Sequence, residues 1–385
     1  MLTDCASLIF KFIFLRYNKL WFVLQISVQI IANIWRWVLI MANEKFILID
    51  GSSMLVTNYY GNLPKALLFE KDPEKKEKLY SQILHNDKGQ YTNAIYGMMR
   101  TILKIIAEQK PTHMMFAFDM TRDTFRREKY PDYKGNRGET PEPLKEQFEN
   151  MEKLLLEMGF QVFFDNKFEA DDIVGSVVTK FEKEIPSFII TKDHDYLQLV
   201  SDYTRVWLIQ TKQETADELL NKYGAEYGWN SKLAAIPDKA FEVTPPLCLS
   251  EYGVKPEQIP DLKGIQGDTS DNIPGVKGVS SAAIPLLAEY GTIEKIYEAI
   301  DECGGDAKAL KALGAHWKED LGISRSPMKA LTEYRDMAFL SKELAQIRRD
   351  YDTGKTLEDF RININKDRAK ELFLEYGFKS LIEKL

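Results

Sequence analysis

The chain has 385 residues, which is long enough for two domains or for one large domain with an appendage. Hydrophobic residues make up 44% and charged residues 28%, an ordinary globular composition, and the net charge of −7 argues against a generally basic nucleic-acid-binding surface. The three cysteines, Cys5, Cys248 and Cys303, are widely separated and do not have the spacing of zinc ligands, so no zinc site is expected. The same cysteine usage predicts a reducing, intracellular compartment.

The first forty residues differ in composition from the rest. Five charged residues with a net charge of +3 lie among aliphatic and aromatic side chains, and the uncharged residues 20–35 include four polar ones. That run is short and polar for a transmembrane span, and no signal-peptide cleavage site follows it. We expect residues 1–40 to be an upstream extension outside the fold, with translation starting at Met41; a membrane anchor is the alternative.

From residue 45 the sequence alternates between strand-like and helix-like patterns. Repeated β-α-β units of this length predict an α/β fold, a parallel sheet with helices on both faces. Ligands bind beyond the carboxyl ends of strands in such sheets, and Asp50, Asp119 and Asp193 fall at that edge. The expected strands are residues 46–49, 114–118, 162–164, 188–191 and 206–209, and the expected helices are residues 94–106, 144–158 and 169–181.

The second half of the chain is predicted to be organised differently. Residues 210–252 are polar and contain three prolines, which indicates a linker or an inserted loop. The periodicity after residue 254 is mostly helical. We therefore expect a core over residues 41–210, a divergent insertion or linker over 211–252 and a helical region over 253–385.

Carboxylates are concentrated in five short stretches, several of them directly after strand-like runs. Gathered on one rim, they would repel each other strongly unless hard cations lay between them. The pattern predicts a pair of hard divalent cations and metal-assisted chemistry on a phosphate. The candidate ligands are Asp50, Asp119, Glu169, Asp171, Asp172, Asp193, Asp195, Asp268 and Asp271.

These acids also have simpler interpretations. The dipole of a helix beginning near Glu169 favours acids in its first turn, and Asp193 and Asp195 could be solvated loop acids or a helix cap. Helix-dipole stabilisation or capping explains one or two acidic residues. It does not explain three acidic candidates at one helix start next to two aspartates at strand ends, so metal ligation is the favoured interpretation. His194 is a lone histidine and is assigned no role.

Residues 122–137 concentrate positive charge, with six basic residues against three acidic ones. Cations interleaved with aromatic rings suit single-stranded nucleic acid, although a solvated loop is the competing interpretation. Arg127, Tyr133 and Arg137 are predicted to bind the nucleic acid.

Residues 264–278 are rich in turn-forming residues. Their glycines would let backbone N–H groups approach a phosphate closely, and the predicted contacts are Gly275, Lys277 and Gly278. With the flanking helices this loop would grip a duplex backbone without reading its sequence. A turn-rich loop without function is the alternative, which Asp268 and Asp271 make less attractive.

With these residues in hand, the chain resembles the 5′→3′ exonuclease domain of bacterial DNA polymerase I and the related flap endonucleases. The resemblance runs from about residue 45 to residue 385 and is weakest across residues 210–252. The motifs that carry it are residues 125–126, 133–137, 169–172, 193–199 and 267–278.

The resemblance implies a PIN-like nuclease core, a helical arch at about residues 120–148 and a helix–three-turn–helix element that binds duplex DNA. The nine acids would hold two or more Mg²⁺ or Mn²⁺ ions, and the arch residues Arg126, Lys134 and Arg137 would contact the scissile phosphate or the threaded strand. Of these, Lys134 and Arg126 would neutralise charge on the reacting phosphate, as catalytic residues. Relatives also bind a potassium ion at the helix–three-turn–helix. This chain departs from the family at Ser280 and Ala282, where a glycine and a lysine are usual, so one phosphate contact is absent.

The function expected from the resemblance is a stand-alone, monomeric 5′–3′ exonuclease and 5′-flap endonuclease. It would hydrolyse branched or 5′-ended DNA, and RNA–DNA primers, in replication and repair, in the cytoplasm at the nucleoid. A catalytically silent DNA-binding relative is the alternative, and a hydrolase of small phosphoesters is a third interpretation. The last would leave the basic segment and the glycine-rich loop without a role.

Overall fold

The structure is a computed structural model that describes residues 44–121, 123–224 and 236–385. The expected upstream extension and Met41 lie outside the described residues. Residues Phe46–Leu385 form one compact unit. In the part of the chain that is described, no helix combines the length and the apolar character needed to cross a bilayer.

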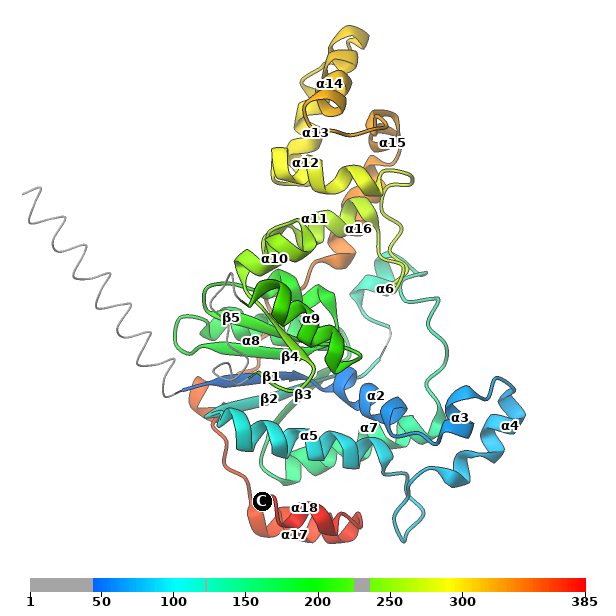
Figure 1. Ribbon diagram of the computed structural model, residues 1–385, viewed down its shortest axis with the longest axis vertical. Coiled ribbons are helices and arrows are strands. Elements are labelled where there is room, and N and C mark those ends of the chain that lie inside the picture. The colour runs from blue at the N-terminus through cyan, green and yellow to red at the C-terminus, as the bar shows by residue number, and fades with distance from the viewer. Residues whose placement is uncertain (1–43, 122, 225–235) are drawn as a thin grey trace, which may run out of the picture. The chain divides into compact units, whose positions relative to one another are not determined.

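A sheet of six strands within the described residues lies at the centre of this unit, in the order β3-β2-β1-β4-β5-β6 (Figure 1). The first five strands pair in parallel, which confirms the predicted parallel sheet, and β6 pairs antiparallel with β5. The strand order reverses at β1, which is where ligands bind in sheets of this type. The strands are β1 (Phe46–Asp50), β2 (His113–Asp119), β3 (Gln161–Asp165), β4 (Ser187–Thr191), β5 (Thr204–Ile209) and β6 (Ala240–Val243).

Alternating side chains of β1 enter two separate hydrophobic cores. Phe46 and Leu48 join the core beneath α8 (Ala170–Phe181), whereas Ile47 and Ile49 join the core formed with the helices on the opposite face. Because every residue of β1 is buried, the strand reads as a continuous apolar run, as expected in a sheet covered on both faces. The helices of the second face are α2 (Gly51–Gly61), α5 (Asn93–Gln109) and α7 (Glu142–Glu157).

The C-terminal half is mostly helical, as predicted, and then returns to the sheet. The ring of Phe360 lies 5.1 Å from the ring of Phe46, and α17 packs against α7. The short helices between α2 and α7 are α3 (Lys65–Phe69), α4 (Pro73–Lys78) and α6 (Phe125–Lys129). The later helices are α11 (Ile259–Gln266), α12 (Ala283–Tyr290), α13 (Ile293–Asp301), α14 (Ala307–Glu319), α15 (Met328–Glu333), α16 (Arg335–Ala345), α17 (Lys366–Glu375) and α18 (Lys379–Ile382).

The segment expected to be a linker instead contributes α9 (Gln213–Tyr223), β6 and α10 (Pro245–Tyr252). The edge strand β6 is held by Trp207, a buried side chain of β5 whose indole N–H donates to Glu242 at 2.8 Å. The prolines misled the prediction, because Pro245 and Pro246 occupy the first turn of α10, where a missing N–H costs nothing.

Gly51 allows α2 to begin directly beneath β2. A Cβ atom at Gly51 would lie 2.5 Å from the buried ring of Phe118, so alanine there requires the ring to move. We expect Gly51→Ala to lower the free energy of unfolding by about 1–3 kcal/mol, measured by chemical denaturation. Gly61→Ala is the matched control, because nothing lies within 4 Å of a Cβ at the other end of α2. Equal stability of the two variants would contradict this packing.

Candidate metal centre

The ends of β1 and β2 place two aspartates at the carboxyl edge of the sheet. Asp50 is only 6% exposed and caps α2, accepting hydrogen bonds from the Ser53 N–H at 2.9 Å and from the Thr191 hydroxyl at 2.8 Å. Asp119 accepts a hydrogen bond at 2.9 Å from the backbone N–H of Ala170, the first residue of α8. These two acids therefore lie where the sequence predicted them.

The N-terminus of α8 adds the next acids. Glu169 is the N-cap residue, and its carboxylate accepts hydrogen bonds from the hydroxyls of Thr124, at 2.7 Å, and Tyr133, at 3.3 Å. The ammonium group of Lys134 lies 2.5 Å from the same carboxylate. Asp171 follows in the first turn of α8, next to Ala170, whose N–H donates to Asp119 at the end of β2.

A further group joins the turn after β4 to the loop after α11. Asp193 caps the short 3-10 helix η2 (His194–Leu199), which contains the buried Asp195. Lys263 of α11 forms ion pairs with both Asp195 and Asp268, the latter at 2.5 Å. The loop is closed by two backbone hydrogen bonds of 2.8 Å between Asp268 and Ile273. The two chain segments thus meet through an ammonium group.

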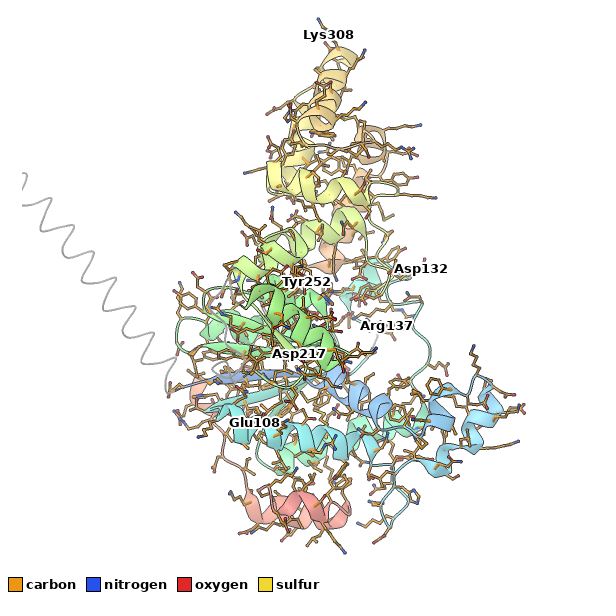
Figure 2. All side chains as sticks on the ribbon, viewed as in Figure 1. Glu108, Asp132, Arg137, Asp217, Tyr252 and Lys308 are labelled. Atoms are coloured by element: carbon orange, nitrogen blue, oxygen red, sulfur yellow. The ribbon has the colours of Figure 1, made fainter. Side chains whose placement is uncertain are left out.

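Asp271 connects this loop to the basic segment. Its carboxylate accepts hydrogen bonds from the Tyr133 hydroxyl and from Arg137, which is labelled in Figure 2, and its carbonyl accepts from the backbone N–H of Lys134 at 2.8 Å. Lys134 has a positive φ of 53°, so its backbone is held in an unusual conformation at this contact. Among the described residues of the predicted arch that precede α7, only Phe125–Lys129 form a helix, α6.

Burial and mutual repulsion act strongly on three of the acids. Burial and the charge of Asp119 raise the pKa of Asp50 to about 7. Burial and the charge of Asp172 raise the pKa of Asp171 well above its usual value, and burial also raises the pKa of Asp193. Such groups lose their protons readily only when positive charge is brought close to them.

Cationic side chains already supply that charge to other acids. Burial alone would raise the pKa of Glu169, but the charges of Lys134 and Arg126 hold it at about 2. Burial likewise opposes the ionisation of Asp268, and Lys263 overcomes it and lowers the pKa to about 2. The acid set is therefore partly neutralised by the protein's own lysines and arginines.

The donor chemistry of this edge fits hard divalent cations. Its described candidate ligands are all carboxylates, whose oxygen atoms Mg²⁺ and Mn²⁺ prefer. Within the residues that the structure describes, no three Asp, Glu, His or Cys side chains already stand close enough together to hold an ion. Lys134, Lys263 and Arg137 lie between the acids instead, so binding of an ion requires these cations to move aside.

Three predicted residues are buried in ways that do not match their expected roles. Arg126 is 1% exposed and pairs with Asp172, which is 0% exposed, so neither side chain lies at the surface of the rim. Tyr133 is 3% exposed and donates its hydroxyl hydrogen to Glu169 and Asp271. A ring buried in this way cannot stack on a base, because its faces are already covered by protein.

The remaining predicted contacts lie on or beneath the surface of the same region. Arg127 is partly exposed and pairs with Asp123 at 3.1 Å, and Lys277 and Gly278 are exposed. Gly275 is buried with a φ of 61°, and a Cβ there would lie 2.2 Å from the backbone nitrogen of Gly267. Glycine is therefore required at this turn for packing.

The two departures from the family pattern differ in exposure. Ser280 is exposed, whereas Ala282 is buried in the hydrophobic core next to α12. A lysine at residue 282 would have to reach out of that core to meet a phosphate.

Sequence reasoning missed several residues that contact the acids, and two of them join separate segments of the chain. Lys263 bridges Asp195 and Asp268, and Thr191 donates to Asp50. The signal for Thr191 was its place at the end of β4, next to the end of β1. Lys263 precedes Asp268 by five residues on a helix that then turns back, and no periodic pattern marks that contact.

The raised pKa of Asp50 predicts that the free energy of unfolding of the metal-free protein falls as the pH rises. Because the folded state holds the Asp50 proton more tightly than the unfolded state, this group's contribution to stability is lost as the pH rises towards about 7. In EDTA, Asp50→Asn should gain stability relative to the natural chain by up to about 4 kcal/mol between about pH 4 and pH 8. Denaturation at both pH values measures the difference, and a difference independent of pH would contradict it.

Solved structures with the same fold share little sequence with this chain. A structure of T5 5′-exonuclease with bound zinc ions matches 86% of this chain and 100% of its own, with a TM-score of 0.50 and 18% identity. The catalytic core of Rad2 in complex with a DNA substrate matches 89% of this chain and 93% of its own, with a TM-score of 0.51 and 16% identity. These similarities support the fold.

Curated relatives are more similar in sequence. DNA polymerase I of Bacillus caldotenax is 36% identical over 346 residues, and that of Bacillus subtilis is 32% identical over 345 residues; each match covers 89% of this chain. The chain spans about a third, 32%, of the length of these relatives. Residues 45–224 match the N-terminal resolvase-like domain of the 5′-3′ exonuclease family, and residues 254–368 match its C-terminal SAM fold. The chain belongs to the 5′-3′ exonuclease family.

Proposed function

We propose that this protein is a metal-dependent 5′–3′ exonuclease and 5′-flap endonuclease that hydrolyses DNA phosphodiester bonds. The observation that carries the proposal is the convergence of acids from β1, β2, α8, η2 and the loop after α11 on one edge of the sheet, with Lys134 and Arg137 among them. Family membership and the DNA-bound and metal-bound structures of similar fold support it.

Two groups of acids would hold the ions. Bound Mg²⁺ or Mn²⁺ would lower the pKa of a water molecule and stabilise charge on the leaving 3′ oxygen. The carboxylates provide only ligation and orientation, so the reaction needs no nucleophilic side chain. The first proposed group is Asp50, Asp119, Glu169 and Asp171, and the second is Asp193, Asp195, Asp268 and Asp271.

Lys134 and Arg137 would bind the scissile phosphate. The Lys134 ammonium lies 2.5 Å from Glu169 and 3.7 Å from Asp271, and Arg137 pairs with Asp271. Ions bound to those carboxylates would weaken these pairs by competing for the same oxygens. Each cation would then be free to neutralise a phosphate oxygen at the same edge.

The substrate is proposed to be branched or 5′-ended DNA, including RNA–DNA primers, as in primer removal and repair at the nucleoid. The exposed Lys277 and Gly278 follow the loop that carries Asp268 and Asp271, so a duplex backbone held there would lie next to the acids. A potassium ion at this loop and action as a monomer belong to the same proposal.

Cleavage of a 5′-flap oligonucleotide in Mg²⁺ tests the proposed activity. Asp193→Ala should lower the rate at least about 100-fold, because it removes a carboxylate of the second group. Asp217→Ala on α9 is the control, since Asp217 is an exposed acid outside the cluster, and it should keep the natural rate. Binding of the flap without cleavage by the natural chain in saturating Mn²⁺ would instead favour a silent DNA-binding protein.

Lys134→Met tests the role of the arch cation. Removing one electrostatic contact to the reacting phosphate should lower kcat about 100- to 1,000-fold while changing the KM for the flap little. Lys370→Met on α17 is the control, because Lys370 is an exposed lysine outside the predicted arch, where it pairs with Asp367. A change in KM alone would contradict contact with the reacting group.

A further inference from the structure

Four of the five N–H donors of the Arg126 guanidinium group are engaged inside the protein. It donates two parallel hydrogen bonds to Asp172, from Nη1 at 2.8 Å and from Nη2 at 2.7 Å. Its Nε donates to the Leu344 carbonyl at 2.9 Å, and Nη2 also donates to the Gln346 carbonyl at 3.0 Å. An arginine with these partners and 1% exposure has little donor capacity left for a phosphate.

The carboxylate of Asp172 is equally saturated. Besides the two bonds from Arg126, it accepts the backbone N–H of Glu169 at 3.1 Å and that of Arg348 at 2.8 Å. A carboxylate has about four lone-pair sites, and four donors already occupy them. Ligation of an ion by Asp172 would break charge-assisted bonds and leave Arg126 as an unpaired buried charge, which is strongly unfavourable.

The backbone partners of the pair come from residues 344–348, the return segment after α16. Gln198 of η2 also holds this segment, donating to the Ala345 carbonyl at 3.0 Å and accepting the Ile347 N–H at 2.9 Å. α8 approaches the segment so closely that a Cβ at Gly175 would lie 2.5 Å from Ile347. The return segment is thereby fixed to the two elements, α8 and η2, that carry proposed ligands.

The return segment continues directly from α16, which packs against the element proposed to hold the duplex. α16 packs along α11, and the Ser341 hydroxyl accepts a hydrogen bond at 3.0 Å from the N–H of Gly275 in the loop. A continuous series of contacts therefore joins the loop after α11 to α16, α16 to residues 344–348, and these residues to the N-terminus of α8. Arg126 adds the base of the arch, because it lies in α6.

We propose that Arg126 and Asp172 are a positioning pair, and that neither contacts the scissile phosphate or an ion. The pair fixes the first turn of α8, and with it Glu169 and Asp171, to the return segment and to the start of the arch. This inference rests on the proposed function, because Glu169 and Asp171 matter as ligands only if the edge binds ions. It replaces the catalytic role expected for Arg126 and the ligand role expected for Asp172.

Counting bound Mn²⁺ by electron paramagnetic resonance, without DNA, separates a ligand from a positioning residue. Asp172→Asn should keep the natural number of bound ions, with affinity weakened about 10- to 100-fold by the loss of orientation. Asp171→Asn, the matched neighbour, should lose an ion. Loss of an ion in Asp172→Asn would overturn the proposal.

Asp172→Asn leaves Arg126 unpaired and could impair folding, so a second variant is needed. The double variant Arg126→Gln with Asp172→Asn removes both charges and should melt at a higher temperature than Asp172→Asn alone. Independent, additive losses of stability in the two single variants would contradict a direct pair.

The salt dependence of flap binding in Ca²⁺ tests whether Arg126 touches a phosphate. The logarithm of the binding constant falls as the logarithm of the salt concentration rises, and removing one phosphate contact makes this negative slope shallower by about one. Arg137→Gln should show the shallower slope, whereas the double variant should keep the natural slope. A shallower slope in the double variant would overturn the proposal. If the natural chain binds no Mn²⁺, the proposed function fails, while the coupling between Arg126 and Asp172 in melting would still be measurable.

Discussion

The repulsion among carboxylates at one edge of the sheet is the constraint on which the rest of this structure depends. Asp50 is buried, and Asp171 and Asp193 are partly buried, each close to other acids; the pKa of each is raised. The fold offsets this cost with basic side chains that come from other segments, of which Lys134 and Lys263 are the clearest. Each such contact also joins a segment distant in sequence to the edge of the sheet. The ion pairs that balance the charge of the acids therefore also stabilise the tertiary structure.

In this structure, ammonium and guanidinium groups pair with the carboxylates at the edge. Under the proposed function, the same carboxylates would hold divalent ions, and the basic groups would be released to bind a phosphate. Such an exchange would keep the buried carboxylates paired with positive charge. Since Lys263 joins η2 to the loop after α11, the exchange at that point also links ion binding to the element proposed to hold the duplex.

The sequence predicted what local pattern controls. Short apolar runs located five strands within a residue or two, and the strand ends located Asp50, Asp119 and Asp193. It failed where the deciding contacts are distant: Arg126 meets carbonyls more than 200 residues away, and only those contacts show that it is buried. Strand β6 was missed for a similar reason, because its four residues are recognisable only beside Trp207.

Anomalous diffraction from crystals grown with Mn²⁺ and a 5′-flap oligonucleotide tests the central claim most directly. The account predicts ions among the carboxylates of Asp50, Asp119, Glu169 and Asp171 and among those of Asp193, Asp195, Asp268 and Asp271. It also predicts that Lys134 and Lys263 have left their carboxylate partners, while Arg126 remains paired with Asp172. Absence of anomalous density at this edge, with both lysines still paired to the acids, would contradict it.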